Sequence, residues 1–462
     1  MTRKEAERGE LTGQKVTVVG LGMEGVDLVR HFAARGADVT VSDARPAKRL
    51  STQLTQLAGL NIALSLGQND PASAAHADAV YVSQGVPLTI PLVAGAAERG
   101  TPIGSMMQLF LRECRGRVVG VTGSSGKSTT TALLGEMFNK SGRKSFTGGN
   151  IGVPLLEKLD EIDEGTWVVL EISHTQLALT DRSPEIAAIT NVTPNHLDRF
   201  SWDEYVALKG NILAYQEADN AAVLNADNEV TRRFADEARG RVVMTTLGDP
   251  DDGDWVYLED ERVLARLDGD TRELFALADI RLPGQHNVEN ALTAAAVAAV
   301  AGIEPDAIKR AIQGFRGIPH RLELVRRVDS VRYYNDSIAT TPERTVAGLR
   351  AFAGEPILLL LGGRHKHLPW DPLVGEAKER CRLAICFGEA GAEIEAALKV
   401  GGFGEAMSVG DLHDAVEKAV SLAQSGDIVL FSPACTSFDA YENFEERGEH
   451  FRRLVGAIKE SR

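Results

Sequence analysis

The sequence predicts an α/β fold with three domains, of which the first and last are Rossmann-like and the central one has a mainly parallel sheet. Short apolar runs rich in β-branched residues alternate with helical patterns along the chain. Continuous apolar runs between helices are typical of parallel strands covered on both faces. At 462 residues the chain is too long for one compact core. The expected strands cover 15–20, 37–43, 78–84, 117–123, 166–173, 186–192, 220–226, 356–362, 383–388 and 427–434.

Two turn-rich segments interrupt this alternation and indicate where domains end. Residues 248–255 (GDPDDGDW) lead into 256–277, where short strands separated by acidic turns predict antiparallel hairpins at a domain edge. Residues 316–325 (RGIPHRLELV) contain the Gly and Pro of a linker, and a new strand–helix alternation follows them. The predicted domains are 1–102, 103–317 and 318–462.

Charge and composition limit the possible partners. A net charge of −15 and a pI near 5.3 argue against a nucleic-acid binder, because most of the surface would repel a phosphate backbone. The longest apolar run, 291–303, is too short to span a bilayer and predicts a buried helix. The N-terminus has no apolar signal core and the cysteines have no metal-binding spacing, so we expect a cytoplasmic protein with reduced thiols and no membrane span.

Residues 14–43 carry a dinucleotide-binding pattern in its full context. Gly20, Gly22 and Gly25 join an expected strand to an expected helix, and Asp43 ends the next strand. The glycines let the backbone approach a phosphate at a helix N-terminus, and Asp43 could accept hydrogen bonds from a ribose or a base. The pattern favours a nucleotide without saying which one, so an NAD-dependent oxidoreductase and a turn without ligand both remain open.

A second glycine-rich turn, GVTGSSGKSTT at 120–130, resembles a phosphate-binding P-loop with unusual spacing. The usual pattern has Gly, four residues and then Gly-Lys-Ser/Thr, but Val121 stands where the first Gly belongs. The turn still places Lys127 and several backbone N–H groups at the start of a helix, where Ser128 or Thr129 can reach a metal ion. A flexible linker would not join a buried strand to an amphipathic helix, so we interpret the turn as a phosphate site.

Two candidate metal ligands follow other strands of the central domain. Glu171 ends the run at 166–173, and His196 comes shortly after the run at 186–192. Ligands gather at the carboxyl ends of parallel strands. A carboxylate and an imidazole there could bind a second Mg²⁺ beside the one at the P-loop. Each residue alone would more often be structural; their shared position beside the P-loop favours a metal site.

These motifs resemble those of the Mur ligases, the ATP-dependent enzymes that add amino acids to the UDP-N-acetylmuramoyl peptide precursor. The family loop reads roughly G-[IV]-T-G-[ST]-x-G-K-[ST], which Gly120, Gly123, Gly126 and Lys127 satisfy. GGNIG, NVTPNHLDR and LPGQHNVENALTAAA are similar to family segments as well. Within the family, the chain most resembles the glutamate-adding branch. The similar segments are VVGLGMEG, SQGVP, IPHRLELV, YYNDSIATTPE, LLLGGRHK and FSPACTSFDAYENFEERGEHF. The resemblance therefore covers nearly the whole chain.

The resemblance implies ATP, two Mg²⁺ ions and a role for each matched residue. The implied catalytic residues are Lys127 on the β- and γ-phosphates, His196 on the second metal ion, and Lys209 as the lysine that the family carbamylates. The implied metal ligands are Ser128, Glu171, His196 and Lys209. The implied ATP-binding residues are Gly123, Ser124, Ser125, Gly126, Lys127, Ser128, Thr129, Asn287, Asn290, Arg321 and Asp336. The implied residues for the UDP-linked substrate and the amino acid are Gly22, Met23, Asp43, Ser83, Asn150, Lys366, Ser437 and Phe444.

Several residues depart from the family pattern on the substrate side. Ile338 and Thr341 replace Lys and Asn of NDSKATN, His174 and Thr175 replace residues of E-x-S-S-F-Q, and Gln84 replaces the Pro of SPG. None of these changes removes a phosphate or metal ligand. They leave the amino acid open: D-glutamate is expected, and L-glutamate, which a variant branch adds, is the alternative.

The implied reaction is an ATP-dependent amide synthesis in peptidoglycan precursor assembly. A substrate carboxylate would attack the γ-phosphate, and the glutamate amine would then displace phosphate from the acyl phosphate. Closure about the linker near 317 would bring the UDP-muramoyl nucleotide, glutamate and ATP together in a monomer. A folylpolyglutamate synthase-like ligase would normally lack the N-terminal domain, and an NAD oxidoreductase would explain only 14–43. A nucleotide-binding regulator would have no reason to place Glu171, His196 and Lys209 together.

Overall fold

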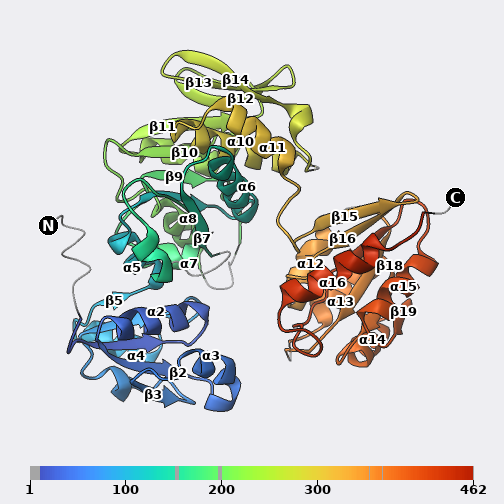
Figure 1. The fold of residues 1–462 in the computed structure, drawn as a ribbon, viewed down its shortest axis with the longest axis horizontal. Helices are drawn as coiled ribbons and strands as arrows, with labels where there is room; N and C mark the ends of the chain where they lie inside the picture. The colour runs from blue at the N-terminus through green and yellow to red at the C-terminus, as the bar shows by residue number, and fades with distance from the viewer. Residues whose placement is uncertain are drawn as a thin grey trace. The chain divides into compact units, whose positions relative to one another are not determined.

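The computed structural model describes residues 11–150, 156–195, 200–282, 284–352, 354–366 and 368–460. The chain divides into two compact units, Met1–Phe315 and Arg316–Arg462 (Figure 1). The first unit holds two β-sheets and the second holds one. The predicted α/β class is confirmed; the boundary at 102 stays a prediction.

The first sheet has five strands, all paired in parallel, in the order β3-β2-β1-β4-β5. This order places β1 at the centre, with the glycine turn of residues 20–25 at its carboxyl end. The strands are β1 (Lys15–Val19), β2 (Asp38–Asp43), β3 (Ile62–Leu66), β4 (Ala79–Val82) and β5 (Ile103–Gly104). The helices are α2 (Met23–Ala34), η1 (Ala47–Leu50), α3 (Ser51–Gln56), η2 (Pro71–Ala74) and α4 (Pro91–Glu98).

The second sheet has nine strands in the order β14-β13-β12-β11-β10-β9-β6-β8-β7, and it is parallel from β7 to β12. Its strands are β6 (Arg117–Thr122), β7 (Ser145–Gly149), β8 (Trp167–Glu171), β9 (Ile186–Ile189), β10 (Ala221–Asn225), β11 (Arg241–Thr246), β12 (Asp254–Glu259), β13 (Arg262–Leu267) and β14 (Asp270–Ala276). Its helices are α5 (Met106–Glu113), α6 (Lys127–Lys140), η3 (Leu156–Glu161), α7 (His174–Leu177), α8 (Trp202–Gly210), α9 (Glu229–Arg233), η4 (Phe234–Asp236), η5 (Leu277–Asp279), α10 (Gln285–Val300) and α11 (Pro305–Gly314).

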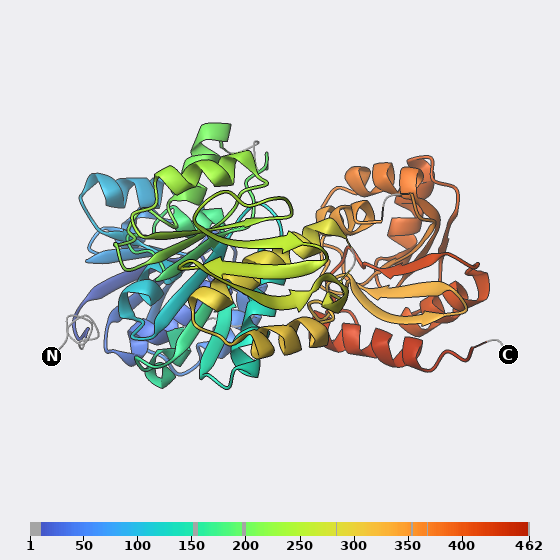
Figure 2. The same ribbon diagram turned by 90° about the horizontal axis from the view of Figure 1, so that it is seen from above.

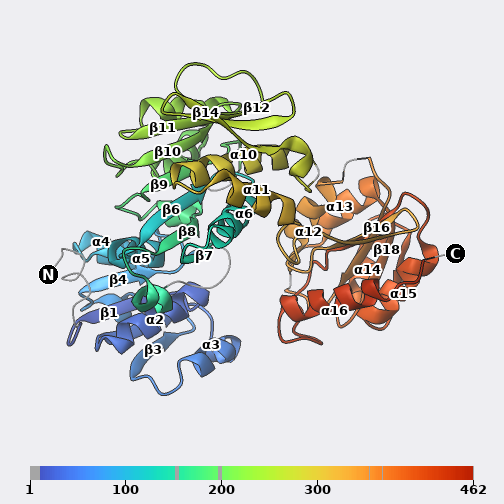
Figure 3. The ribbon, with the colours of Figure 1, turned by 45° about the horizontal axis from the view of Figure 1, so that its top comes forward.

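Strand β8 shows why the apolar runs of this sheet are continuous. Trp167 and Val169 belong to one hydrophobic core, whereas Val168 and Leu170 belong to another. Successive side chains of a strand point to opposite faces, so a sheet buried on both faces needs an apolar residue at every position. Helices α10 and α11 pack beside α6 on one face (Figure 3).

The predicted hairpins are confirmed as strands β12, β13 and β14, which pair antiparallel. They extend the edge of the second sheet (Figure 2). Asp260 and Glu261, which join β12 to β13, both have positive φ, as do Asp268 and Gly269 before β14. Two-residue turns of this left-handed kind match the twist of antiparallel strands.

The helix predicted at 291–303 is confirmed in large part, because α10 ends at Val300 and residues Ala294–Ala298 are completely buried. It lies in a core of the second sheet. In the part of the chain that the structure describes, no helix is long and apolar enough to cross a membrane.

The second unit contains a six-stranded sheet in the order β15-β16-β20-β17-β18-β19, in which only the β15–β16 pair is antiparallel. The strands are β15 (Glu323–Val328), β16 (Val331–Asn335), β17 (Ile357–Gly362), β18 (Cys381–Phe387), β19 (Ala406–Ser408) and β20 (Ile428–Phe431). The helices are α12 (Pro342–Arg350), α13 (Asp371–Arg380), α14 (Gly391–Val400), α15 (Leu412–Leu422) and α16 (Phe444–Gly456).

The described cysteines form no disulfides, and their thiols are largely shielded from solvent. Cys114, Cys386 and Cys435 are buried, and Cys381 is half-buried. Burial raises the pKa of Cys381, Cys386 and Cys435 to about 12. These three thiols therefore stay protonated at neutral pH, which makes them poor nucleophiles.

A buried carboxyl in α2 makes the stability of the first unit depend on pH. Asp27 is 3% exposed; its Oδ2 accepts the Leu156 N–H at 3.2 Å, and its Oδ1 has no partner among the described residues. Burial raises its pKa from 3.8 to about 7. Between these two values the unfolded chain ionises while the folded chain stays protonated, so stability falls as pH rises.

We expect Asp27→Asn to stabilise the protein relative to wild type by about 1–2 kcal/mol at about pH 8 and much less at about pH 5, because the amide needs no proton. Thermal melting of both proteins at the two pH values measures this difference. Asp38→Asn, at an exposed position that starts β2, is the matched control. An equal benefit of Asp27→Asn at both pH values would contradict the prediction.

Candidate active site

The glycine-rich turn that follows β6 requires glycine at the predicted positions. Gly123 and Gly126 have φ values of +148° and +79°. A Cβ on Gly123 would lie 2.0 Å from Thr190 Oγ1, and one on Gly126 would lie 2.1 Å from Asn290 Oδ1. Gly120 is required for packing, since its Cβ would lie 2.4 Å from Pro184. The unusual spacing therefore has a steric basis.

The turn is held by the segment that follows β9. Ser124 Oγ donates to the Thr193 carbonyl and accepts from the Thr193 N–H, both at 2.9 Å. The Ser125 N–H donates to Asn191 Oδ1 at 3.0 Å, and Thr190 Oγ1 donates to the Ser125 carbonyl at 2.6 Å. The loop geometry is therefore fixed by its neighbours.

Lys127 is the first residue of α6, whose N-terminus is directed at the loop. Its Nζ donates to the carbonyls of Gly123 and Ser124 at 2.9 and 3.1 Å. Ser128 is 6% exposed and Thr129 is half-buried in the same first turn. A cation, backbone N–H groups and the helix dipole at one point make an anion site suited to phosphate.

Glu171 lies at the end of β8 and is 2% exposed. Its Oε1 accepts a hydrogen bond from Asn150 Nδ2 at 2.6 Å. Its Oε2 is buried and has no hydrogen-bond partner within the described residues. An unpartnered buried carboxylate oxygen suits a divalent cation, because Mg²⁺ prefers oxygen ligands such as carboxylates. The residues present therefore fit Mg²⁺.

Lys209 enters the same site from α8. It is 1% exposed, and its Nζ donates to Thr122 Oγ1, 3.1 Å away at the end of β6. Burial and the charge of Lys127 lower the pKa of Lys209 to about 6, although the charge of Glu171 acts in the opposite direction. The amine is therefore mostly neutral at pH 7, which is unusual for a lysine.

Two asparagines of α10 line the other side of the loop. Asn290 is 5% exposed, accepts from Thr130 Oγ1 at 3.4 Å and donates to Asn287 Oδ1 at 3.3 Å. The structure thus brings Asn287 and Asn290 to the glycine-rich turn. His196 lies outside the described residues, so its position stays a prediction.

In the first sheet, the predicted nucleotide residues surround a tight turn. Gly20 has φ +88°, and a Cβ on Gly25 would lie 2.1 Å from the Gly20 carbonyl oxygen. Ser83 Oγ donates to that oxygen at 2.5 Å. Gly22 is the N-cap of α2, and Met23 is 65% exposed.

Asp43 is buried and already holds the turn together. Its carboxylate accepts from the Leu21 N–H and from Arg45 Nη2, each at 2.7 Å. Burial alone would raise the pKa of Asp43, but the hydrogen bonds from Arg45 and Leu21 outweigh it and lower the pKa. The observed role is structural, and a contact with substrate stays a prediction.

Comparisons with known proteins agree with this geometry. Residues 14–105, 121–298 and 320–435 match family descriptions that read "Mur ligase MurD-like, N-terminal domain", "Mur ligase middle domain" and "Mur ligase, glutamate ligase domain". The UDP-N-acetylmuramoylalanine–D-glutamate ligase of Symbiobacterium thermophilum is 42% identical over 96% of this chain and 98% of the relative. The protein of the same name from Acetivibrio thermocellus is 39% identical over 97% of this chain and 98% of the relative.

The chain belongs to the Mur ligase family.

Solved structures show the same fold at low identity. The UDP-N-acetylmuramate–alanine ligase of Thermotoga maritima is 19% identical with a TM-score of 0.52, over 96% of this chain and 100% of that one. A murein peptide ligase of Psychrobacter arcticus is 18% identical with a TM-score of 0.51, over 97% and 100%. Mur ligases are ATP-dependent, ADP-forming amide ligases that use Mg²⁺, and this chain is an enzyme of that class. The glycine pattern at 14–43 lies in a Mur ligase N-terminal domain, so an NAD oxidoreductase is no longer supported.

The residues that depart from the Mur ligase pattern in the first unit lie close together. The His174 ring contacts the rings of Phe200 and Tyr205, each with centroids 5.5 Å apart. Thr175 Oγ1 lies 3.0 Å from Ser173 Oγ, the N-cap of α7. His174 is therefore packed beside the aromatic ring that also faces Lys209.

In the second unit, the predicted residues Asp336 and Lys366 follow the ends of β16 and β17. Asp336 is buried, and its carboxylate accepts from Ser432 Oγ at 2.7 Å and from the Leu322 N–H at 3.2 Å. Burial raises the pKa of Asp336 to about 7. Lys366 Nζ donates to Thr340 Oγ1 at 3.2 Å, and burial lowers the pKa of Lys366, with the charge of Arg344 adding to the effect.

The remaining predicted residues of this unit differ in exposure. Ser437 is 2% exposed, Arg321 is exposed, and Phe444 is the first residue of α16. Ile338, which stands where the family pattern has Lys, accepts a hydrogen bond from Arg344 Nη1 at its carbonyl, 3.2 Å away. The Arg344 guanidinium therefore contacts the backbone at this position and not the Ile338 side chain. The contacts of all these residues with substrates stay predictions.

Sequence reasoning missed Arg447, which is 0% exposed. Its guanidinium donates to Ser337 Oγ at 3.1 Å and to the carbonyls of Ser337, Gly362 and Cys435 at 2.9, 3.3 and 3.1 Å. It thereby joins the ends of β16 and β17 to the segment after β20. In the sequence, Arg447 is one of several charged residues in the segment that forms α16. Only its position in the EERGEH segment distinguishes it from the others.

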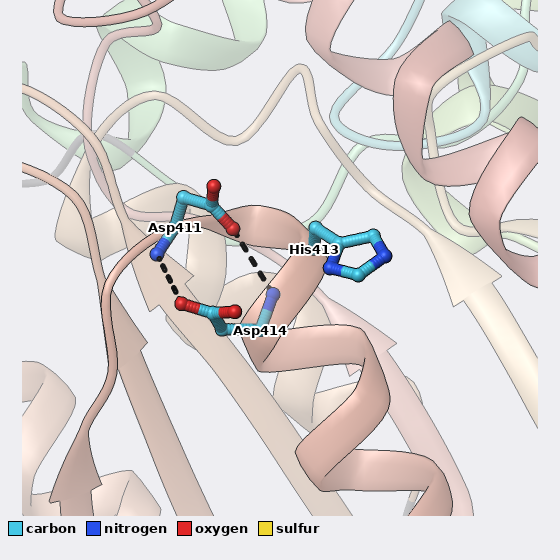
Figure 4. Close-up of side chains that lie close together, drawn as sticks. All are labelled: Asp411, His413 and Asp414. Carbon is cyan, nitrogen blue, oxygen red and sulfur yellow. Dashed lines mark hydrogen bonds between the residues drawn. The ribbon is translucent and has the colours of Figure 1, made fainter.

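In the second unit, three side chains of the kinds that bind metal ions lie close together at the start of α15 (Figure 4). The Asp414 N–H donates to Asp411 Oδ1 at 3.0 Å, and the Asp411 N–H donates to Asp414 Oδ2 at 3.4 Å. This reciprocal pair is a helix capping box. Asp411, His413 and Asp414 are exposed, and their arrangement is explained by the cap.

Proposed function

We propose that this chain joins D-glutamate to UDP-N-acetylmuramoyl-L-alanine by ATP-dependent amide synthesis. The observation that carries the proposal is the meeting of Lys127, Glu171 and Lys209 around the glycine-rich turn. The names of the relatives, which match along almost their whole length, support the choice of substrates.

The reaction proceeds in two steps. An oxygen of the alanyl carboxylate attacks the γ-phosphorus of ATP, and ADP leaves. The amine of glutamate attacks the resulting acyl carbon, phosphate leaves, and the amine loses its proton. Lys127 moves from its two loop carbonyls to the transferring phosphoryl group and offsets its charge. Bound Mg²⁺ would supply further charge stabilisation on the phosphate oxygens.

Ser128 and Glu171 are the proposed ligands of the first Mg²⁺, with His196 and a carbamylated Lys209 at a second. The unpartnered Glu171 Oε2 supports the first assignment. For the nucleotide we propose Gly123–Thr129, Asn287, Asn290, Arg321 and Asp336. For the UDP-linked substrate and the amino acid we propose Gly22, Met23, Asp43, Ser83, Asn150, Lys366, Ser437 and Phe444.

The enzyme is proposed to act in the cytoplasm, where ATP and nucleotide-linked precursors are found, and to act as a monomer. Lys127 in α6, Glu171 at the end of β8 and Lys209 in α8 all belong to one chain, which supports a site that needs no partner subunit.

Phosphate release tests the substrates directly. We expect phosphate release from ATP–Mg²⁺ to need both UDP-N-acetylmuramoyl-L-alanine and D-glutamate. With L-glutamate in place of D-glutamate, we expect the rate to fall by a factor of about ten or more. Faster turnover of L-glutamate than of D-glutamate would show that the enzyme adds L-glutamate. This is the second candidate specificity, which the departures from the family pattern at Ile338 and His174 leave open. Full release without the muramoyl nucleotide would overturn the proposal.

The neutral amine of Lys209 supports carbamylation, because only an unprotonated amine attacks carbon dioxide. With a pKa of about 6 the amine is available at neutral pH and becomes protonated below that value. We expect isotopically labelled bicarbonate to give a carbamate signal in the carbon NMR spectrum that Lys209→Met lacks and that fades below about pH 6. Lys144→Met, which removes a lysine on the surface, is the control. A signal that survives Lys209→Met would contradict the assignment.

A further inference from the structure

Gln84, in the loop after β4 of the first sheet, is linked through Asn150 to Glu171, at the end of β8 in the second sheet. Its Nε2 donates to Asn150 Oδ1 and to Ser173 Oγ, each at 3.0 Å. Its backbone N–H donates to Glu24 Oε2 at 2.8 Å. Gln176 Nε2 donates to the other oxygen of the same carboxylate at 2.8 Å.

The contact with Asn150 fixes which way that carboxamide faces. A carboxamide has a donating and an accepting end, and its neighbours determine which end faces which. Gln84 donates to Oδ1, so Nδ2 is directed to Glu171 Oε1, 2.6 Å away. The backbones of Asn150 and Glu171 are already joined, since the Asn150 N–H donates to the Glu171 carbonyl at 2.9 Å. The remaining freedom is rotation of the Asn150 side chain, and the Gln84 donor and the Glu171 acceptor restrict it in the same sense.

The same arrangement decides which oxygen of Glu171 is open. Because Nδ2 of Asn150 occupies Oε1, Oε2 is left buried and unpartnered. A reversed carboxamide would place an oxygen against Oε1, and the two acceptors would repel each other. The carboxylate would then turn away from its present orientation.

We propose that Gln84 is a positioning residue, which acts through Asn150 to hold Glu171 Oε2 toward the metal ion. The proposal rests on the proposed function, in which Glu171 is a ligand of Mg²⁺. It also gives a physical meaning to one departure from the family pattern. Proline, the pattern's residue at this position, has neither the carboxamide nor the N–H that reaches Glu24.

Two variants separate the donated hydrogen bonds from the shape of the side chain. Gln84→Ala keeps the backbone bond to Glu24 and loses the side-chain bonds. Gln84→Glu has almost the same shape but can only accept, so it favours the reversed Asn150. Gln56→Ala, at an exposed position in helix α3 beside the first sheet, is the matched control.

The measurement is Mn²⁺ binding to the full chain in the presence of ADP. Electron paramagnetic resonance of the free ion reports how much Mn²⁺ is unbound. We expect Gln84→Glu and Gln84→Ala to raise the Mn²⁺ dissociation constant about tenfold, as is usual when a residue that orients a metal ligand is lost. Gln56→Ala is expected to match wild type, and melting temperatures are expected to change little. Wild-type affinity in Gln84→Glu would overturn the proposal.

Glu171→Gln distinguishes this failure from failure of the proposed function. If Glu171→Gln weakens Mn²⁺ binding and Gln84→Glu does not, Glu171 is a ligand but Gln84 does not position it. If Glu171→Gln also binds Mn²⁺ as wild type does, the metal site itself is wrongly assigned, and the positioning role is overturned with it.

Discussion

Lys127→Ala is expected to lower kcat for phosphate release about 10³-fold, the loss typical of removing a group that stabilises charge in a transition state. The ammonium lies at the N-terminus of α6 and is held by two carbonyls of the glycine-rich turn. The phosphate oxygens of bound ATP carry more negative charge than these carbonyl oxygens, so we expect the ammonium to bind them instead. Alanine leaves the backbone N–H groups of the turn but removes the only side-chain cation that the described part of the turn itself contributes.

Lys127→Arg and Lys140→Ala make the result specific. Arginine keeps the charge but not the compact ammonium, so we expect partial activity. Lys140 ends the same helix, and its replacement by alanine is expected to leave kcat unchanged. The melting temperature of Lys127→Ala is expected to stay near that of wild type, because the side chain is half-exposed. A kcat within tenfold of wild type would contradict the proposed role.

Arg447→Met is expected to lower the free energy of unfolding of the second unit by about 3–5 kcal/mol, because it leaves several buried carbonyls without donors. Burial lowers the pKa of Arg447 to about 10, which still leaves the side chain charged at neutral pH. Its four hydrogen bonds make that burial tolerable, and methionine replaces none of them.

Hydrogen exchange of the full chain measures this effect by region. Peptides from β16, β17 and β20 are expected to exchange much faster in Arg447→Met, while peptides from the first unit keep their wild-type rates. Arg453→Met, at an exposed position in the same helix, is the control. A loss below about 1 kcal/mol would show that the network is not important for stability.

The sequence predicted the elements that depend on local pattern. The α/β class and the hairpins of 254–276 followed from hydrophobic periodicity and turn residues, and both are confirmed. The glycine-rich turn was also found from sequence, since Gly123 and Gly126 are set by a local backbone conformation that favours glycine.

Contacts between distant segments could not be predicted in this way. Gln84 reads as an exposed loop residue, and its partners Asn150 and Ser173 lie in other strands' loops. Arg447 carries the same charge as its exposed neighbour Arg453, and only the packing of α16 tells them apart.

The protonated, shielded thiols have a practical consequence for spectroscopy. A maleimide reacts with thiolates, and the three thiols with a pKa of about 12 form almost none at neutral pH. The fourth, Cys114, is 1% exposed. A cysteine engineered on the surface of each unit would therefore carry a dye while the native thiols stay in place. Energy transfer between two such dyes would follow the units during turnover in an otherwise wild-type enzyme.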